Sequence, residues 1–234
     1  MLSVRSVHAG YGDFQVLHDV SIDVGEGELV LLVGPNGHGK STLLKTVTGL
    51  VAPTSGAIRW RGEPIHCLRA DRIAERGVVY VAEDRHLFPA MSVHKNLLLG
   101  AYNRNARSCW ERNLERVYEL FPRLRERAGQ AAATLSGGEA RMVAIGRGMM
   151  ANASLMALDE PSLGLSPIMR SEMFAVVRKL NREGMSILLV EQAMPKNFDN
   201  ADRVYLMEEG QITFSGGYAE FTGDDSLRTA ILGM

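Results

Sequence analysis

The pattern of apolar and polar positions predicts a chain that alternates short β-strands with helices. Segments 2–7 and 16–24 alternate apolar and polar residues, which is typical of strands with one buried face. The segment "ELVLLV" (28–33) is apolar at nearly every position, as expected of a central parallel strand buried on both faces. A helix is predicted from about Lys40 to Leu50. Further strands are predicted at 56–65 (as a pair), 77–81, 154–159, 186–191 and in a closing hairpin around Glu209 and Gly210.

From about Arg85 to Ala151 the pattern is almost entirely helical. One apolar stripe recurs at three- and four-residue steps and is assigned to the core; it consists of Trp110, Leu114, Val117 and Phe121. Strands that alternate with helices indicate a parallel sheet covered on both faces. We therefore predict an α/β fold in one domain, with an N-terminal antiparallel β part. Its parallel-sheet core spans about 1–84 and 152–234, and a helical subdomain of about 85–151 is inserted into it.

The composition describes an ordinary soluble globular protein and excludes several classes of function. The 234 residues are 46% hydrophobic and carry a formal net charge of −1, so no general attraction to nucleic acid or anionic lipid is expected. No apolar run approaches the roughly 18 residues of a membrane span, and no signal-peptide pattern opens the chain. Cys67 and Cys109 lack metal-ligand or redox spacing, and we expect both to be buried thiols. These features predict a cytosolic protein that reaches a membrane only through a partner.

The segment "GPNGHGKST" (34–42) follows the apolar strand and precedes the first predicted helix. It matches the pattern G-x-x-x-x-G-K-[ST], in which glycines let backbone N–H groups turn around phosphate oxygens. In this pattern Lys40 reaches the β- and γ-phosphates and the Ser41 hydroxyl binds Mg²⁺. His38 is expected to be a spacer whose side chain points outward; a plain glycine turn is the alternative for the whole segment. The predicted nucleotide-binding residues are Gly34, Pro35, Asn36, Gly37, His38, Gly39, Lys40, Ser41 and Thr42.

Two acidic residues end the apolar segment "LMALDEP" (155–161). A carboxylate at the end of a neighbouring buried strand is the second half expected of a P-loop site. We expect Asp159 to hold Mg²⁺, directly or through water, and Glu160 to orient or deprotonate a water that attacks the γ-phosphate. A polar strand end without function is the alternative. Together with the P-loop, this segment predicts binding and hydrolysis of Mg·ATP, with Lys40 and Glu160 as the catalytic residues.

The segment "LSGGEARM" (135–142) places two glycines at the start of a predicted helix. Ser136 and Glu139 fit a capping box, so the helix start is well specified. A glycine in a helix nevertheless costs about 1 kcal/mol relative to alanine. The positions of Gly137 and Gly138 therefore require a reason, such as the close approach of another group.

Over essentially its whole length the chain resembles ABC-transporter ATPase subunits. The resemblance rests on the P-loop, the sequence "LSGGE" some hundred residues later and an apolar strand ending in "LDEPS". In that family two subunits associate head to tail, and each "LSGGE" helix faces the γ-phosphate held by the other subunit. The resemblance implies that Ser136, Gly137 and Gly138 contact a nucleotide bound by a second subunit. It also implies that this chain acts as a dimer, peripheral to the cytoplasmic face of the cell membrane, with transmembrane permease subunits as partners.

The resemblance implies roles for three further residues. Tyr11, in "AGYGDFQVL", matches the aromatic residue that stacks on adenine, and a core tyrosine is the alternative. Glu83 stands where the family usually has a glutamine that touches Mg²⁺ and the transmembrane partner. Gln192 stands where the family usually has a histidine that contacts the γ-phosphate. A carboxylate thus replaces a neutral amide, and a neutral amide replaces an imidazole that can carry positive charge.

These two replacements resemble one branch of the family. With "PSLGL" (161–165) and the tail "LRTAILGM" (227–234), they look like the second ATPase subunit of branched-chain amino-acid importers, and related importers of urea and short amides share much of the pattern. Those importers commonly pair two different ATPases. The segment "SLGL" (162–165) lacks the aspartate of the commoner Ser-Ala-Leu-Asp, and Ala82 differs from the commoner proline.

Three functions are compatible with these residues. The first is an ATP-hydrolysing motor subunit of an importer for branched-chain amino acids or related small solutes. The second, motivated by Glu83 and Gln192, is a weakly hydrolysing ATP-binding clamp that completes the site of a catalytic partner. The third is a soluble ABC ATPase acting on nucleic acid or the ribosome, which the near-neutral charge and compact helical insertion disfavour. The predicted partners are permease subunits and a second ATPase subunit, either a different chain or a second copy, and no nucleic acid.

Overall fold

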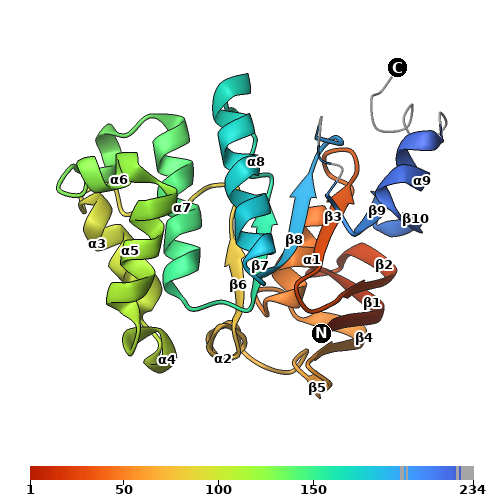
Figure 1. Cartoon of the computed structure of the whole chain (residues 1–234). Coiled ribbons are helices and arrows are strands. Elements are labelled where there is room, and N and C mark those ends of the chain that lie inside the picture. Colours follow the sequence, from red (N-terminus) through yellow and green to blue (C-terminus); the bar gives the residue numbers. More distant parts are fainter. Residues whose placement is uncertain (196–197, 199, 225–226, 228–234) are drawn as a thin grey trace.

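The protein consists of two β-sheets and the helices that cover them (Figure 1). The structure is a computed structural model that describes residues 1–195, 198, 200–224 and 227. The tail used in the comparison above lies outside the described residues, except for Leu227. The strands are β1 (Leu2–Tyr11), β2 (Phe14–Val24), β3 (Leu29–Val33), β4 (Pro53–Trp60), β5 (Glu63–Pro64), β6 (Val78–Val81), β7 (Leu155–Asp159), β8 (Ser186–Glu191), β9 (Arg203–Glu208) and β10 (Gln211–Gly216). The α-helices are α1 (Lys40–Val47), α2 (Ala70–Glu75), α3 (Val93–Leu98), α4 (Arg104–Arg107), α5 (Trp110–Leu120), α6 (Pro122–Glu126), α7 (Gly137–Met150), α8 (Pro167–Arg182) and α9 (Tyr218–Gly223).

The larger sheet has six strands in the order β10-β9-β3-β8-β7-β6. The strands from β9 to β6 are parallel, and β10 is antiparallel to β9. The smaller sheet is antiparallel, in the order β2-β1-β4-β5. Between β6 and β7 every described element is a helix, counting the 3-10 turns at Leu99–Ala101 and Ala132–Thr134. The predicted fold class is therefore confirmed.

Alternate residues of β3 belong to two different hydrophobic clusters, which explains why this strand is apolar throughout. Leu29, Leu31 and Val33 pack with α8 and the helices between β6 and β7. Val30 and Leu32 pack with α1 and the antiparallel sheet on the other side. Figure 1 shows α8 across the front of β7 and β8, with α3 to α7 beside β6. The parallel sheet is thus buried on both faces, and polar groups lie at the ends of its strands.

The stripe on α5 lies in the core as predicted. Leu114, Val117 and Phe121 are buried, and Trp110 is partly buried against the same cluster. The stripe fixes the helices between β6 and β7 onto the sheet edge, so it is a packing feature rather than a binding site.

Two expectations about single elements are wrong. The first helix ends at Val47 rather than near Leu50, whose side chain is exposed. The two cysteines were expected to be buried, but Cys67 is exposed and Cys109 is only partly buried. Both are free thiols. Among the described residues, no helix is both long and apolar enough to span a membrane.

Candidate functional site

The loop between β3 and α1 has the backbone conformation that a phosphate-binding loop requires. A β-carbon at Gly34 would lie 2.1 Å from the carbonyl oxygen of Met207, so only glycine fits there. Gly39 is left-handed (φ +101°) and forms the N-cap of α1. No side chain caps this helix and its first turn has no acidic residue, so its positive end is left for an anion from outside the helix. The loop therefore fits a phosphate group.

Lys40 is the buried cation of this loop. Its side chain is 3% exposed, and its ammonium donates to the carbonyl oxygens of Gly34 (2.8 Å) and Pro35 (3.0 Å). The ammonium also lies 3.2 Å from the carboxylate of Glu160. Three acceptors thus satisfy the ammonium within the site, and the pair places Lys40 and Glu160 in direct contact although they are far apart in the sequence.

Asp159 ends β7 and accepts one hydrogen bond from the first turn of α1 and one from strand β6. The Ser41 hydroxyl donates to one carboxylate oxygen (3.0 Å) and the Tyr80 hydroxyl to the other (2.7 Å). Burial raises the pKa of Asp159, while the hydrogen bonds from Tyr80 and Ser41 lower it. A hydroxyl and a carboxylate side by side are hard oxygen donors of the kind that Mg²⁺ prefers, so the pair fits this ion.

The sequence predicted this carboxylate on a strand that neighbours β3, and that detail is wrong. In the sheet, β8 lies between β3 and β7, and the side chains of Ser41 and Asp159 meet beyond the end of β8. Tyr80 was missed altogether. The only signal for it was a single hydroxyl in the otherwise apolar strand 78–81.

The turn after β7 holds Glu160 in a strained backbone conformation. Glu160 has φ +41°, which non-glycine residues rarely adopt, and its N–H donates to the carbonyl of Val190 (3.0 Å). Two residues later, both the N–H (3.1 Å) and the hydroxyl (2.8 Å) of Ser162 donate to the carboxylate of Glu191. Hydrogen bonds from Glu160 and from Ser162 therefore tie the turn to the end of β8. Glu191 is a second residue that the sequence did not reveal.

Glu191 is a buried carboxyl group with a strongly raised pKa. It is 6% exposed, and burial raises its pKa from 4.5 to about 7. The hydrogen bonds from Ser162 lower that pKa, the charge of Glu160 raises it, and Arg170 lowers it. The group therefore changes protonation near neutral pH, immediately beside Glu160.

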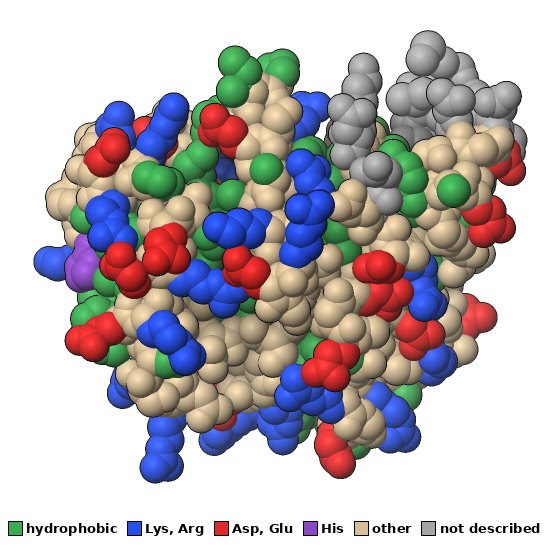
Figure 2. All heavy atoms as spheres, in the orientation of Figure 1, with side chains coloured by type: hydrophobic (Ala, Val, Ile, Leu, Met, Phe, Trp, Pro, Cys, Tyr) green, Lys and Arg blue, Asp and Glu red, His purple; other side chains and the backbone are tan. Residues whose placement is uncertain are grey.

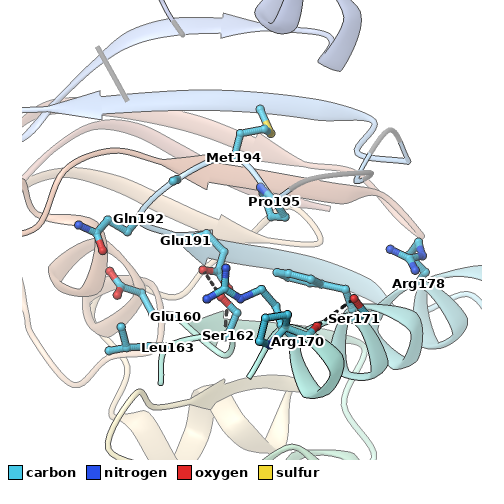
Figure 3. Close-up of a pocket in the computed structure, with 13 residues that line it drawn as sticks. Glu160, Ser162, Leu163, Arg170, Ser171, Arg178, Glu191, Gln192, Met194 and Pro195 are labelled. Atoms are coloured by element: carbon cyan, nitrogen blue, oxygen red, sulfur yellow. Dashed lines mark hydrogen bonds between the residues drawn. The ribbon is translucent and has the colours of Figure 1, made fainter. Parts of the chain in front are cut away.

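Figure 3 shows the cavity of about 810 Å³ into which these residues open. Glu160 and Gln192 lie at one end of this cavity, and Arg170 and Arg178 enter it from α8. Gln192 is exposed. The structure therefore brings Gln192 to the same end of the sheet as Glu160, as a γ-phosphate contact requires, and its role stays a prediction.

The start of α7 has the predicted capping box. The Ser136 hydroxyl accepts a hydrogen bond from the N–H of Glu139 (3.3 Å) and donates to its carboxylate (2.8 Å), which also accepts from the Ser136 N–H (2.9 Å). A β-carbon at Gly137 would lie 3.5 Å from the guanidinium of Arg85, and one at Gly138 only 2.5 Å from the methyl group of Met169. Gly138 thus makes room for the Met169 side chain, whereas a β-carbon at Gly137 would meet Arg85 only at ordinary contact distance. The predicted contact with a second subunit's nucleotide is a separate matter and stays a prediction.

The remaining predicted residues lie around the same edge. Tyr11 ends β1 and is 49% exposed, as an adenine-stacking residue needs to be. Glu83 follows β6 and is exposed; partial burial raises its pKa, and so do the nearby carboxylates of Glu160 and Asp159. His38 is not the outward-pointing spacer that was expected, because its Nδ1 accepts a hydrogen bond from the N–H of Glu209 (2.9 Å). Its ring fixes the P-loop to the hairpin between β9 and β10.

A glycine loop after a buried parallel strand, a buried lysine and a serine–aspartate pair define a P-loop nucleotide-binding protein. Comparison with known proteins narrows this class. Residues 17–163 match the family model described as ABC transporter. The chain is 42% identical over 233 residues to the high-affinity branched-chain amino acid transport ATP-binding protein BraG of Pseudomonas aeruginosa, covering 100% of both chains.

Two further likenesses agree. The chain is 32% identical to the probable branched-chain amino acid transport ATP-binding protein LivF of Archaeoglobus fulgidus, covering 100% of this chain and 99% of that protein. The solved structure of the ADP conformation of an ATP-binding cassette of an ABC transporter superimposes with a TM-score of 0.84 at 26% identity, covering 100% of this chain and 99% of that one. The chain belongs to the ATP-binding proteins of ABC transporters. It is accordingly a nucleotide-binding ATPase coupled to transport.

Proposed function

We propose that the chain is the ATP-hydrolysing motor subunit of an importer for branched-chain amino acids or related small solutes. The convergence of Lys40, Ser41, Asp159 and Glu160 at one edge of the parallel sheet carries the catalytic part of this proposal. The solute class is supported by the names of BraG and LivF, both of which match the whole chain.

In this proposal each residue of the site has one task. The P-loop N–H groups and the start of α1 bind the phosphates, Lys40 contacts the β- and γ-phosphate oxygens, and Tyr11 stacks on adenine. Ser41 and Asp159 hold Mg²⁺, which neutralises phosphate charge when bound. Glu160 orients the attacking water and accepts its proton. Because Lys40 pairs with Glu160 at 3.2 Å, phosphate oxygens that take over this ammonium also release the Glu160 carboxylate for the water.

A second cassette completes the site in this proposal. Ser136, Gly137 and Gly138 contact the nucleotide of that cassette, which is either a companion chain or a second copy. The helices of about 85–151 form a subdomain that follows permease subunits at the cytoplasmic face of the membrane, and residues 1–84 and 152–234 form the core. Figure 2 supports a partner other than nucleic acid, since acidic and basic side chains are interspersed over the face it shows.

The weakly hydrolysing clamp is a second candidate, favoured by one specific observation. Glu83 lies within the electrostatic influence of Glu160 and Asp159, both of which raise its pKa. A third carboxylate near the phosphates repels their negative charge, where the glutamine common in the family does not. If this candidate is right, Glu83→Gln combined with Gln192→His raises ATP turnover of the chain at least tenfold. Unchanged turnover contradicts it.

The proposed function is tested by pulling tagged Glu160→Gln protein out of detergent-solubilised native membranes in Mg·ATP. This substitution removes the base but keeps the side-chain shape, so the closed assembly should accumulate. A tagged protein with Glu172→Gln, an exposed glutamate of α8, is the matched control. Recovery of permease chains and a second ATPase with both proteins is expected, with tighter retention of the ATPase by Glu160→Gln. Recovery of the chain without any integral membrane protein contradicts the transport assignment.

A further inference from the structure

Three positively charged features meet at the start of α7. The first is the N-terminal end of the helix itself. The second is the guanidinium of Arg85, which lies 3.5 Å from where a β-carbon at Gly137 would be. The third is Arg141, which is 2% exposed and close enough to Arg85 that the charge of Arg85 lowers its pKa, after the larger effect of burial.

Neither arginine makes an ion pair within the described part of the chain, although the charges of Glu83, Glu191 and Asp159 raise the pKa of Arg141 against the larger effect of burial. The Arg85 side chain makes no hydrogen bond or ion pair with any described residue. Arg141 donates from one terminal nitrogen to the carbonyl of Ala82 (3.2 Å), and its buried Nε has no hydrogen-bond partner there. Glu139, the acidic residue in the first turn of α7, is occupied by the capping box and by Arg127 at 2.9 Å.

Helix α7 also fixes the backbone from which Arg85 extends. Arg85 (φ +63°) and His86 (φ +43°) are both left-handed, which is costly for non-glycine residues. Arg147, on the same helix, donates to the carbonyl oxygens of Arg85 (2.8 Å) and His86 (2.7 Å). The strained loop is therefore fixed to the last turn of α7, while the Arg85 guanidinium reaches to 3.5 Å from where a β-carbon at Gly137 would lie, at the first turn.

A cation beside the N-terminal end of a helix is unfavourable unless an anion joins them. We propose that Arg85 is a phosphate-binding residue of the composite site, contacting the terminal phosphate of the ATP that the second cassette's P-loop holds. This inference rests on the proposed function, in which that phosphate approaches the start of α7. A guanidinium supplies two parallel, charge-assisted hydrogen bonds to phosphate oxygens, which the capped helix start alone does not.

The test compares Arg85→Gln, Arg85→Lys and the control Arg182→Gln, an exposed arginine at the far end of α8. Each is measured in two ways. ATP hydrolysis is followed against ATP concentration in the complex purified through the tagged chain from native membranes. Nucleotide affinity and melting temperature are measured on the isolated chain.

Arg85→Gln is expected to lower kcat/KM for ATP at least tenfold in the complex, with Arg85→Lys in between and Arg182→Gln unchanged. Affinity of the isolated chain for ATP stays within twofold, because the chain's own P-loop is intact. The melting temperature without nucleotide stays equal or rises, since an unbalanced cation has been removed, whereas loss of a merely structural arginine lowers it.

The outcomes separate the inference from the function on which it rests. Wild-type kcat/KM for Arg85→Gln in a functional complex overturns the inference alone. A lowered melting temperature together with lost affinity in the isolated chain also overturns it, in favour of a structural role. If the wild-type chain recovers neither permease nor second cassette, the proposed function falls, and the composite contact of Arg85 falls with it.

Discussion

Replacing Glu191 by glutamine is expected to stabilise the protein above neutral pH. The carboxylate is 6% exposed and its pKa is raised to about 7, chiefly by burial. A glutamine has the same shape, can accept the hydrogen bond from the Ser162 N–H, and can donate to the Ser162 hydroxyl oxygen. The substitution therefore removes the buried negative charge while both contacts to Ser162 are kept.

The magnitude follows from the difference in proton affinity between the folded and unfolded chain. The carboxyl has a pKa of 4.5 when unperturbed and about 7 in the folded protein. Between these values the folded protein holds a proton that the unfolded chain releases, so stability is greatest below pH 4.5 and falls as pH rises to 7. At about 1.4 kcal/mol per pKa unit, the loss reaches roughly 3 kcal/mol above pH 7. Glutamine does not ionise and has no such loss.

The assay is thermal unfolding of the nucleotide-free protein at several pH values from 5 to 8.5. The melting temperature of Glu191→Gln should rise above that of the wild type progressively, by about 6–12 °C at the alkaline end for a chain of this size. Glu172→Gln, on the exposed face of α8, should follow the wild type throughout. Parallel curves for Glu191→Gln and wild type would refute the reasoning, because they would mean that burial does not disfavour this charge.

Two further predictions concern the phosphate and Mg²⁺ edge of the sheet. Tyr80→Phe removes the 2.7 Å hydrogen bond to Asp159, and should lower the free energy of unfolding measured in urea by about 1–3 kcal/mol. It should also raise the Mg²⁺ concentration needed for ATP hydrolysis. Unchanged Mg²⁺ dependence would show that this hydroxyl does not orient the carboxylate. Gly34→Ala drives a β-carbon to 2.1 Å from the Met207 carbonyl, and should abolish binding of a fluorescent ATP analogue, whereas Gly129→Ala, where nothing lies within 4 Å, should bind normally. Normal binding by Gly34→Ala would contradict the tight fit of the loop.

The sequence predicted those parts of the site that are formed by contiguous residues. The P-loop and the capping box of α7 are each specified within ten residues, so their local geometry follows from residue type and spacing. The alternation of buried strands with helices likewise predicted the sheet, because the spacing of apolar residues within each segment indicates a strand or a helix without knowledge of the segments that pack against it.

Contacts between distant segments could not be predicted in this way. Glu191 meets Ser162 only because β7 and β8 are adjacent and in a particular register. His38 meets the β9–β10 hairpin through the pairing of β9 with β3. A single sequence contains the residues of each pair but not the strand order, and the strand order also placed β8 between the two halves of the predicted ATP site.

The two helix starts in the proposed composite site are built differently, and the difference indicates an order of events. Helix α1 has no side-chain cap and no acid in its first turn, so its positive end and Lys40 suffice to bind phosphate within one chain. Helix α7 already has its cap satisfied by Ser136 and Glu139, and a carboxylate in its first turn opposes a second anion. We therefore expect a phosphate to bind α1 first, and α7 only where extra positive charge offsets Glu139. In the proposed composite site Arg85 supplies that charge, so the proposal implies that nucleotide binds one cassette before that cassette closes against the other.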